Sequence, residues 1–397
     1  MKNLLEWLQF LEQRNAHQPI QLGLERVKTV AQRMELLRPA RTIITVAGTN
    51  GKGSTVMALD KMYRDAGYRV GAYVSPHIID FRERILFQGN WITESELLAA
   101  LEAVETAREE ISLTYFEHTT LAAWVYFKSL SLDLLIQEVG MGGRLDATNV
   151  LDPDLAIITT VDWDHQAYLG NTLEAIAYEK AGIIRKNTPV IYGDMPVPEA
   201  VLKQADRLSS PLYALGREYL LSDFPLTQAS RIHPHSAAAA WQACQLLQNT
   251  LPLDLASAAR SMQTLQVPGR WHQFVFQGVT HCCDVAHNPQ AAQSFAYYVL
   301  KTFPDQKKIV LFSALADKNI AEMVTPFLGK VDAWCCGRLS GPRAADENVL
   351  REALQHAPLV YWQDTIAAAY EQALHLAERQ QAMLIVYGSF LTVSVVL

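Results

Sequence analysis

The chain has 397 residues, half of them apolar and 19% charged, which is enough apolar material for more than one ordinary domain. Asp and Glu (41) outnumber Lys and Arg (34), and the net charge of −7 argues against a nucleic-acid partner held by a basic surface. No apolar run is long enough to span a membrane, and five cysteines without a C-x-x-C spacing favour reduced thiols in the cytoplasm over disulfides or zinc.

The first twelve residues place Leu4, Leu8 and Leu11 at helical spacing, with polar residues between them. This pattern predicts an amphipathic helix and not a signal peptide. Short β-branched runs then alternate with longer helical patterns, which is typical of βαβ units around a mostly parallel sheet. The strands expected in this part of the chain are 42–46, 132–136, 155–160 and 190–192.

A breaker sequence, Val-Pro-Gly-Arg at 267–270, precedes a second alternating series. Its expected strands are 279–285, 308–312, 331–335 and 382–387. We therefore expect an α/β chain with two domains. Residues 1–266 would form a P-loop-type, mostly parallel sheet flanked by helices, and residues 267–397 a smaller, Rossmann-like α/β domain.

The most specific segment follows the expected strand 42–46 and opens a helical pattern. It reads Gly48-Thr49-Asn50-Gly51-Lys52-Gly53-Ser54-Thr55. Glycines let backbone N–H groups turn toward an anion, a helix N-terminus adds positive charge, a lysine reaches the outer phosphates, and a hydroxyl can lie near Mg²⁺. The loop departs from G-x-x-x-x-G-K-[ST], because Val46 takes the first glycine position and Gly53 follows the lysine. We predict that it binds ATP; the alternative is a glycine-rich turn without a ligand.

Glu138 ends the expected strand 132–136, where its carboxylate could face the phosphate loop and ligate Mg²⁺. For this residue alone, a helix-capping or salt-bridging role is an equal alternative. The glycines at 140, 142 and 143 favour the ligand role, because their backbones can approach a ligand closely. His165 follows the next strand, where a lone histidine is more often structural.

The phosphate loop resembles that of the Mur ligase superfamily, in particular its folylpolyglutamate synthase and dihydrofolate synthase branch. Blocks spread over nearly the whole chain are similar to the same family. They are Leu22-Gly23-Leu24-Glu25-Arg26-Val27, Ser75-Pro76-His77, Thr114-Tyr115-Phe116-Glu117, the E-V-G-x-G-G-R-x-D-A-T-N block at 138–149, Asp164-His165, Glu179-Lys180-Ala181-Gly182-Ile183, Asp284-Val285-Ala286-His287-Asn288-Pro289 and Gly388-Ser389-Phe390.

The resemblance implies roles for individual residues. They are Ser75, Glu138 and His165 as metal ligands; Lys52, Lys180 and His165 as catalytic residues; Arg270, Asp284 and His287 as ATP contacts from the second domain; and Leu24, Glu25, Arg26, Thr114, Phe116, Asp146 and Ala147 as contacts of a pterin substrate. In the family the lysine at position 180 is carbamylated, which would support a second Mg²⁺. Taken alone, Lys180 could be a solvated helix lysine, and 284–289 could be an Asx turn at a strand end.

The implied activity is an ATP-dependent ligase that joins L-glutamate to dihydropteroate and to reduced folates through an acyl phosphate. Such an enzyme would be cytoplasmic and monomeric, with small-molecule substrates and no nucleic-acid or membrane partner. Two alternatives have different requirements. A Mur-type ligase of peptidoglycan precursors would use a nucleotide-sugar acceptor, against which the S-P-H and L-G-L-E-R-V blocks argue. A P-loop ATPase or kinase without an acyl acceptor would turn over ATP independently of glutamate.

Overall fold

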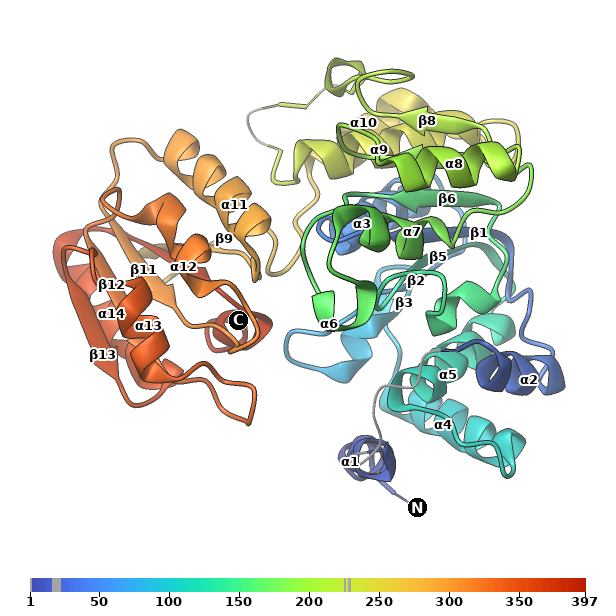
Figure 1. Ribbon diagram of the computed structural model, residues 1–397, viewed down its shortest axis with the longest axis horizontal. Helices are drawn as coiled ribbons and strands as arrows, with labels where there is room; N and C mark the ends of the chain where they lie inside the picture. Colours follow the sequence, from blue (N-terminus) through green and yellow to red (C-terminus); the bar gives the residue numbers. More distant parts are fainter. Residues whose placement is uncertain (1, 16–22, 225, 228–229) are drawn as a thin grey trace. The chain divides into compact units, whose positions relative to one another are not determined.

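A computed structural model of the chain describes residues 2–15, 23–224, 226–227 and 230–397 (Figure 1). The chain divides into two compact units, Met1–Leu265 and Gln266–Leu397. Each unit has its own sheet and its own hydrophobic core. Leu22, which opens the L-G-L-E-R-V block, lies outside the described residues.

Unit 1 is built on an eight-stranded sheet in the order β4-β3-β2-β5-β1-β6-β7-β8. The six strands from β2 to β8 in that order are parallel, and β3 and β4 are antiparallel. Their bounds are β1 Ala40–Ala47, β2 Val70–Tyr73, β3 Ile85–Phe87, β4 Asn90–Trp91, β5 Leu132–Glu138, β6 Leu155–Ile158, β7 Val190–Tyr192 and β8 Leu212–Ala214. The central strand β1 lies between β5 and β6, which explains why seven of its eight residues are buried.

Helices cover this sheet in groups that Figure 1 shows in blue to yellow. Their bounds are α1 Leu4–Asn15, α2 Glu25–Arg33, α3 Lys52–Asp65, α4 Glu94–Arg108, α5 Tyr115–Ser129, α6 Gln166–Leu169, α7 Leu173–Ala181, α8 Glu199–Arg207, α9 Pro234–Leu246 and α10 Leu255–Gln263. One core joins α1, α2, α4 and α5 to the sheet around the fully buried Trp124 and Phe127. A second core lies between β6, β7, α7 and α8.

Unit 2 contains a six-stranded sheet in the order β13-β12-β11-β14-β10-β9, parallel except for β9. The strands are β9 His272–Phe276, β10 Val279–Cys283, β11 Lys308–Phe312, β12 Ala333–Gly337, β13 Val360–Gln363 and β14 Met383–Tyr387. The helices are α11 Pro289–Thr302, α12 Ile320–Val324, α13 Glu347–Ala353, α14 Ile366–Gln380 and α15 Phe390–Ser394. Phe295, Phe327 and Tyr387 pack at the centre of its core.

The predicted α/β class and the mostly parallel sheets are confirmed. The short antiparallel strands β3, β4 and β9 are additions that the sequence reading does not predict. None of the described helices combines the length and the apolar character needed to cross a membrane.

Candidate active site

The loop between β1 and α3 is held in a tight turn by the chain that follows β6. Thr49 N–H donates to Thr160 O at 2.9 Å, and Asn50 N–H donates to Thr160 Oγ1 at 2.9 Å. The Thr159 hydroxyl donates to Asn50 O at 2.6 Å. Gly51 ends the loop in the left-handed region, with φ of 86°. The loop is therefore set before any ligand arrives, and the two threonines that set it are functional residues the sequence reading missed.

Gly48 has a φ of 150°, and a Cβ added there would lie 1.8 Å from Thr159 Oγ1. We expect Gly48→Ala to lower the free energy of unfolding of unit 1 by about 2–3 kcal/mol, because a stiff β-branched neighbour must move. Gly67→Ala is the matched control, since Gly67 also has a positive φ of 91° but has nothing within 4 Å of its added Cβ. Urea unfolding of both variants measures the difference. Equal losses of unfolding free energy in the two variants would show that the clash with Thr159 has no effect.

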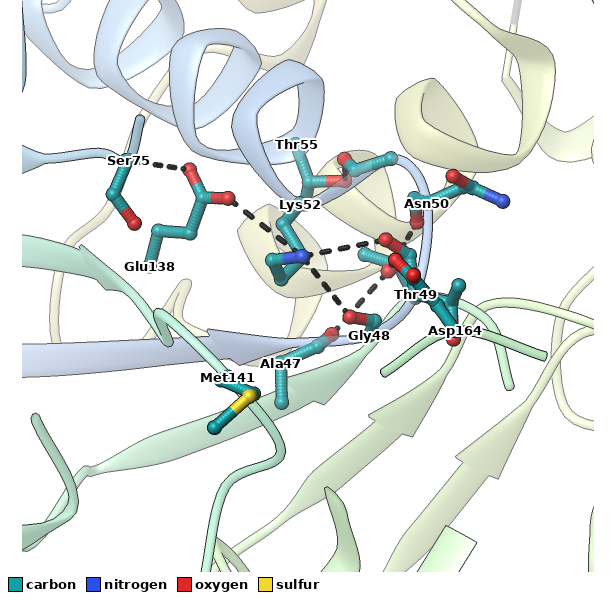
Figure 2. Close-up of polar contacts among 12 residues, drawn as sticks. Ala47, Gly48, Thr49, Asn50, Lys52, Thr55, Ser75, Glu138, Met141 and Asp164 are labelled. Atoms are coloured by element: carbon teal, nitrogen blue, oxygen red, sulfur yellow. Dashed lines mark hydrogen bonds and ion pairs between the residues drawn. The ribbon is translucent and has the colours of Figure 1, made fainter. Parts of the chain in front are cut away.

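Lys52 is the first residue of α3, and its ammonium group lies among oxygen atoms (Figure 2). Its Nζ donates to Gly48 O at 3.1 Å and to Thr49 O at 3.3 Å. It also lies 3.8 Å from Oε1 of Glu138, which is 4% exposed at the end of β5. The prediction that this carboxylate faces the phosphate loop is confirmed, because β5 pairs with β1 at Val46. Gly53, Ser54 and Thr55 continue the first turn of α3.

Ser75 and Glu138 are brought together from neighbouring strands. Ser75 follows β2, and its N–H donates to Glu138 Oε2 at 3.3 Å (Figure 2). A serine hydroxyl and a carboxylate are hard oxygen ligands that suit Mg²⁺, and the ammonium of Lys52 beside them indicates that the donor set favours a cation. Among the described residues, no three His, Cys, Asp or Glu side chains converge to hold a metal by themselves.

His165 lies seven residues beyond the end of β6, so the expectation that it sits at the end of this strand is wrong. It is the N-cap residue of the short α6, with a left-handed φ of 51°. Its Nε2 lies 3.6 Å from Oδ2 of Asp164, and its side chain is 39% exposed. The chain leaves β6 early because Thr159 and Thr160 turn toward the phosphate loop.

Lys180 lies in α7 and is only 3% exposed. Burial lowers its pKa to about 7, the nearby ammonium of Lys52 acts in the same direction, and Asp164 opposes both. The Lys180 amine is therefore buried and lies within electrostatic range of Lys52. The alternative of a solvated helix lysine is therefore wrong.

Two predicted substrate segments meet at the start of α5. Thr114 caps this helix, and the next turn carries Phe116, whose Cζ would lie 2.5 Å from a Cβ added to Gly140. Arg26 Nη2 donates to Glu117 Oε1 at 2.9 Å, which joins α2 to α5. Leu24 is the N-cap residue of α2, and Glu25 is its first residue. Glu117 is a third residue, after Thr159 and Thr160, whose role the sequence analysis did not predict.

Asp146 is buried and caps the 3-10 turn Ala147–Val150. Its carboxylate accepts hydrogen bonds from Met141 N–H at 2.9 Å, Thr148 N–H at 3.0 Å and the Thr148 hydroxyl at 2.7 Å. Burial raises its pKa, and these bonds oppose the shift. The observed contacts of Asp146 thus fix the glycine-rich loop at 140–146.

In unit 2, two of the three residues predicted to contact ATP, Arg270 and His287, lie near Phe390, and the third, Asp284, lies within electrostatic range of both. The Arg270 guanidinium lies 5.1 Å from the centre of the Phe390 ring, and the His287 ring lies 5.9 Å from it. Asp284 accepts from Trp271 N–H at 3.0 Å and from Ala286 N–H at 2.8 Å. The turn at 284–286 is thus an Asx-type turn, which also presents a charged cluster.

Burial raises the pKa of Asp284 to about 6, although Arg270 and the two backbone N–H groups oppose this. Because the folded chain binds this proton more tightly than the unfolded chain does, the free energy of unfolding falls as pH rises from about 4 to about 6. For a shift of roughly two units, the loss is on the order of 3 kcal/mol. We expect Asp284→Asn to remove this part of the pH dependence. Denaturant unfolding of both proteins at pH 4 and pH 7 tests this. The same change in free energy of unfolding between these pH values in both proteins would contradict it.

Two domain families match the chain. The Mur ligase middle domain matches residues 46–238, and the Mur ligase glutamate ligase domain matches residues 269–390. The dihydrofolate synthase/folylpolyglutamate synthase of Escherichia coli K12 is 38% identical, over 98% of this chain and 94% of its own length. This chain belongs to the dihydrofolate synthase/folylpolyglutamate synthase branch of the Mur ligases.

Solved structures of this branch have the same fold. Escherichia coli FolC in complex with DHPP and ADP is 36% identical and superposes with a TM-score of 0.90, covering 100% of this chain and 97% of that one. The bifunctional enzyme of Yersinia pestis, complexed with AMPPNP and Mn, is 37% identical with a TM-score of 0.91 and the same coverage. The resemblance read from the sequence blocks is confirmed. The phosphate loop lies in the middle domain of this Mur ligase, and Arg270, Asp284 and His287 lie in its glutamate ligase domain.

Proposed function

We propose that this Mur ligase is a bifunctional dihydrofolate synthase and folylpolyglutamate synthase. It would add L-glutamate to dihydropteroate and, through γ-links, to reduced folates. The observation that carries the proposal is the preset phosphate loop, in which Lys52 lies beside Glu138, whose carboxylate also accepts from the Ser75 N–H. Relatives with these two activities in their names match nearly the whole chain, and a solved structure of the branch holds Mn, AMPPNP and L-glutamate.

The chemistry must activate a carboxylate, which is a poor electrophile. A carboxylate oxygen of the acceptor attacks the γ-phosphorus of ATP, ADP leaves, and an acyl phosphate forms. The amine of glutamate then attacks the acyl carbon, phosphate leaves, and the amine loses a proton. Lys52 would exchange its carbonyl partners for phosphate oxygens and stabilise the charge that develops on the transferred group.

The metal would be Mg²⁺, held by the Ser75 hydroxyl and the Glu138 carboxylate, with His165 as the third protein ligand. Bound Mg²⁺ ions, two in this proposal, neutralise phosphate charge during transfer. Lys180 would be carbamylated and support the second ion. A pKa of about 7 leaves a large fraction of its amine uncharged at neutral pH, and the uncharged amine is the form that reacts with CO₂.

The acceptor would bind at the segments that meet near α5 and at the loop fixed by Asp146. The residues proposed for it are Leu24, Glu25, Arg26, Thr114, Phe116, Asp146 and Ala147. The residues proposed to contact ATP from unit 2 are Arg270, Asp284 and His287. We further propose that the protein acts as a cytoplasmic monomer.

The test is ADP release by the purified protein with MgATP and L-glutamate, with and without dihydropteroate, followed by mass spectrometry of the pterin. ADP that depends on both substrates, with a product heavier by one glutamyl unit, would support the synthase activity. Tetrahydrofolate in place of dihydropteroate tests the second activity. ADP release without glutamate would instead indicate an ATPase, and inertness toward both pterins would refute the acceptor.

A further inference from the structure

Two adjacent residues in the first turn of α5 each hold an arginine from a different helix. Glu117 binds Arg26 of α2, and His118 contacts Arg14 of α1. Arg14 lies in the last turn of α1, and Arg26 is the second residue of α2. Both helices pack on α4 and α5 within unit 1 (Figure 1). The first turn of α5 therefore contacts both α1 and α2 through these two arginines.

The Glu117 contacts use both carboxylate oxygens. Oε1 accepts from Arg26 Nη2 at 2.9 Å, and Oε2 accepts from Thr114 N–H at 2.8 Å. The Glu117 side chain is 6% exposed and that of Arg26 is 28% exposed. Breaking this pair would leave a buried carboxylate without its cation. One buried carboxylate thus joins the two segments proposed to contact the acceptor, those around Arg26 and Thr114.

The donor and the acceptor of the hydrogen bond between Arg14 and His118 can be assigned. Arg14 Nη2 lies 3.1 Å from His118 Nδ1, and His118 Nε2 lies 3.2 Å from Leu101 O. Since a guanidinium group only donates, Nδ1 accepts, and Nε2 carries the hydrogen that it donates to Leu101 O. The histidine is neutral, in agreement with burial, which lowers its pKa to about 4.

Arg14 is held a second time, by α4. Its Nη1 donates to Glu105 Oε2 at 2.8 Å. The carboxylate of Glu105 also binds Arg108, and the Arg108 hydrogen bond, with help from Arg14, lowers the Glu105 pKa to about 2. Arg14 is thus anchored to a histidine and to a carboxylate that stays ionised at neutral pH.

We propose that Glu117 and His118 are positioning residues for the pterin acceptor, acting through Arg26 and Arg14. By fixing Arg26, Glu117 sets the place of Leu24, Glu25 and Arg26 relative to Thr114. His118, held by Arg14 and Leu101 O, sets the place of the turn of α5 that carries Phe116. The contacts described above for Glu117 and His118 are with Arg26, Thr114, Arg14 and Leu101, none of which belongs to the phosphate loop, so we expect them to affect acceptor affinity separately from ATP affinity. This inference rests on the proposed function, because it takes those five residues as acceptor contacts.

The experiment measures KM for dihydropteroate, KM for ATP and kcat in the wild type, Glu117→Gln and Arg14→Gln. We expect each variant to raise KM for dihydropteroate by about fivefold or more, with KM for ATP and kcat within about twofold. Arg33→Gln is the matched control, because Arg33 also ties α2 to α4 through Ala107 O and Arg108 O but lies at the far end of the helix. This control should leave KM for dihydropteroate unchanged.

A double-mutant cycle shows whether Glu117 acts through Arg26. If it does, Glu117→Gln adds little to KM in an Arg26→Gln background. Equal rises in both KM values, or variants that match Arg33→Gln, would overturn the inference while the wild type still forms the glutamyl product. A wild type without that product overturns the proposed function first, and the inference with it. If Glu117→Gln does not fold, the KM values of Arg14→Gln for dihydropteroate and ATP decide whether the inference holds.

Discussion

Replacing Lys52 with alanine is expected to lower kcat for ADP release by about 10²–10⁴-fold, because the ammonium group meets charge that develops only during phosphoryl transfer. The fold should survive. Lys52 contributes two hydrogen bonds to backbone carbonyls and a 3.8 Å ion pair, whereas Thr159 and Thr160 hold the loop from the other side. Circular dichroism and thermal unfolding of the variant check this.

Lys61→Ala is the matched control, since Lys61 lies in the same helix but pairs with Asp65 at its far end. Its kcat should equal that of the wild type. A folded Lys52→Ala protein with normal turnover would refute the role of the loop. A Lys52→Arg variant refines the result: a cation is kept, but a longer planar group must fit against Gly48 O and Glu138, so partial loss is expected.

Much of the fold could be predicted because buried parallel strands have plain sequence signals. The expected strands 190–192 and 308–312 match β7 and β11, and the run ending at Thr160 is shortened to β6 only because two threonines leave the sheet. The antiparallel strands were harder to see because they are short. Yet Gln88-Gly89 and Gln277-Gly278 have positive φ at both residues, the requirement of tight two-residue hairpins, and the glycine after each glutamine was a usable signal.

The site was predictable where chemistry is local and not where it depends on packing. The order of residues 48–55 predicts a phosphate loop by itself. The pair Lys52–Glu138 joins positions far apart in sequence, and its existence follows from the register of β1 and β5. The partners of Arg26 and Arg14 likewise depend on how α5 packs, so no spacing rule could have identified Glu117 or His118.

Replacing Lys180 should raise the stability of the protein at low pH and lower its activity. Its pKa is about 7 in the folded chain, against 10.5 for an ordinary lysine, so the unfolded chain binds more protons between these values. The free energy of unfolding therefore rises with pH from about 7 to about 10.5. Below pH 7 the burial of the charged Lys180 ammonium destabilises the fold by its full amount, on the order of 5 kcal/mol. In CO₂-free buffer, Lys180→Met should have a higher free energy of unfolding than the wild type at pH 6. This difference should be much smaller at pH 10. Denaturant unfolding measures both.

Replacing Lys180 should lower activity even where it raises stability, because the proposed mechanism uses the amine as a carbamate. We expect Lys180→Ala to lose at least about 100-fold in kcat, as removal of a group that supports a catalytic metal does. Short-chain carboxylates, which restore an oxygen anion in the space left by the side chain, should recover part of this loss. Lys186→Ala, in the exposed chain after α7, is the control and should be unaffected. A stable Lys180→Ala protein that no carboxylate rescues would argue against the carbamate, and the buried amine would then act as an amine.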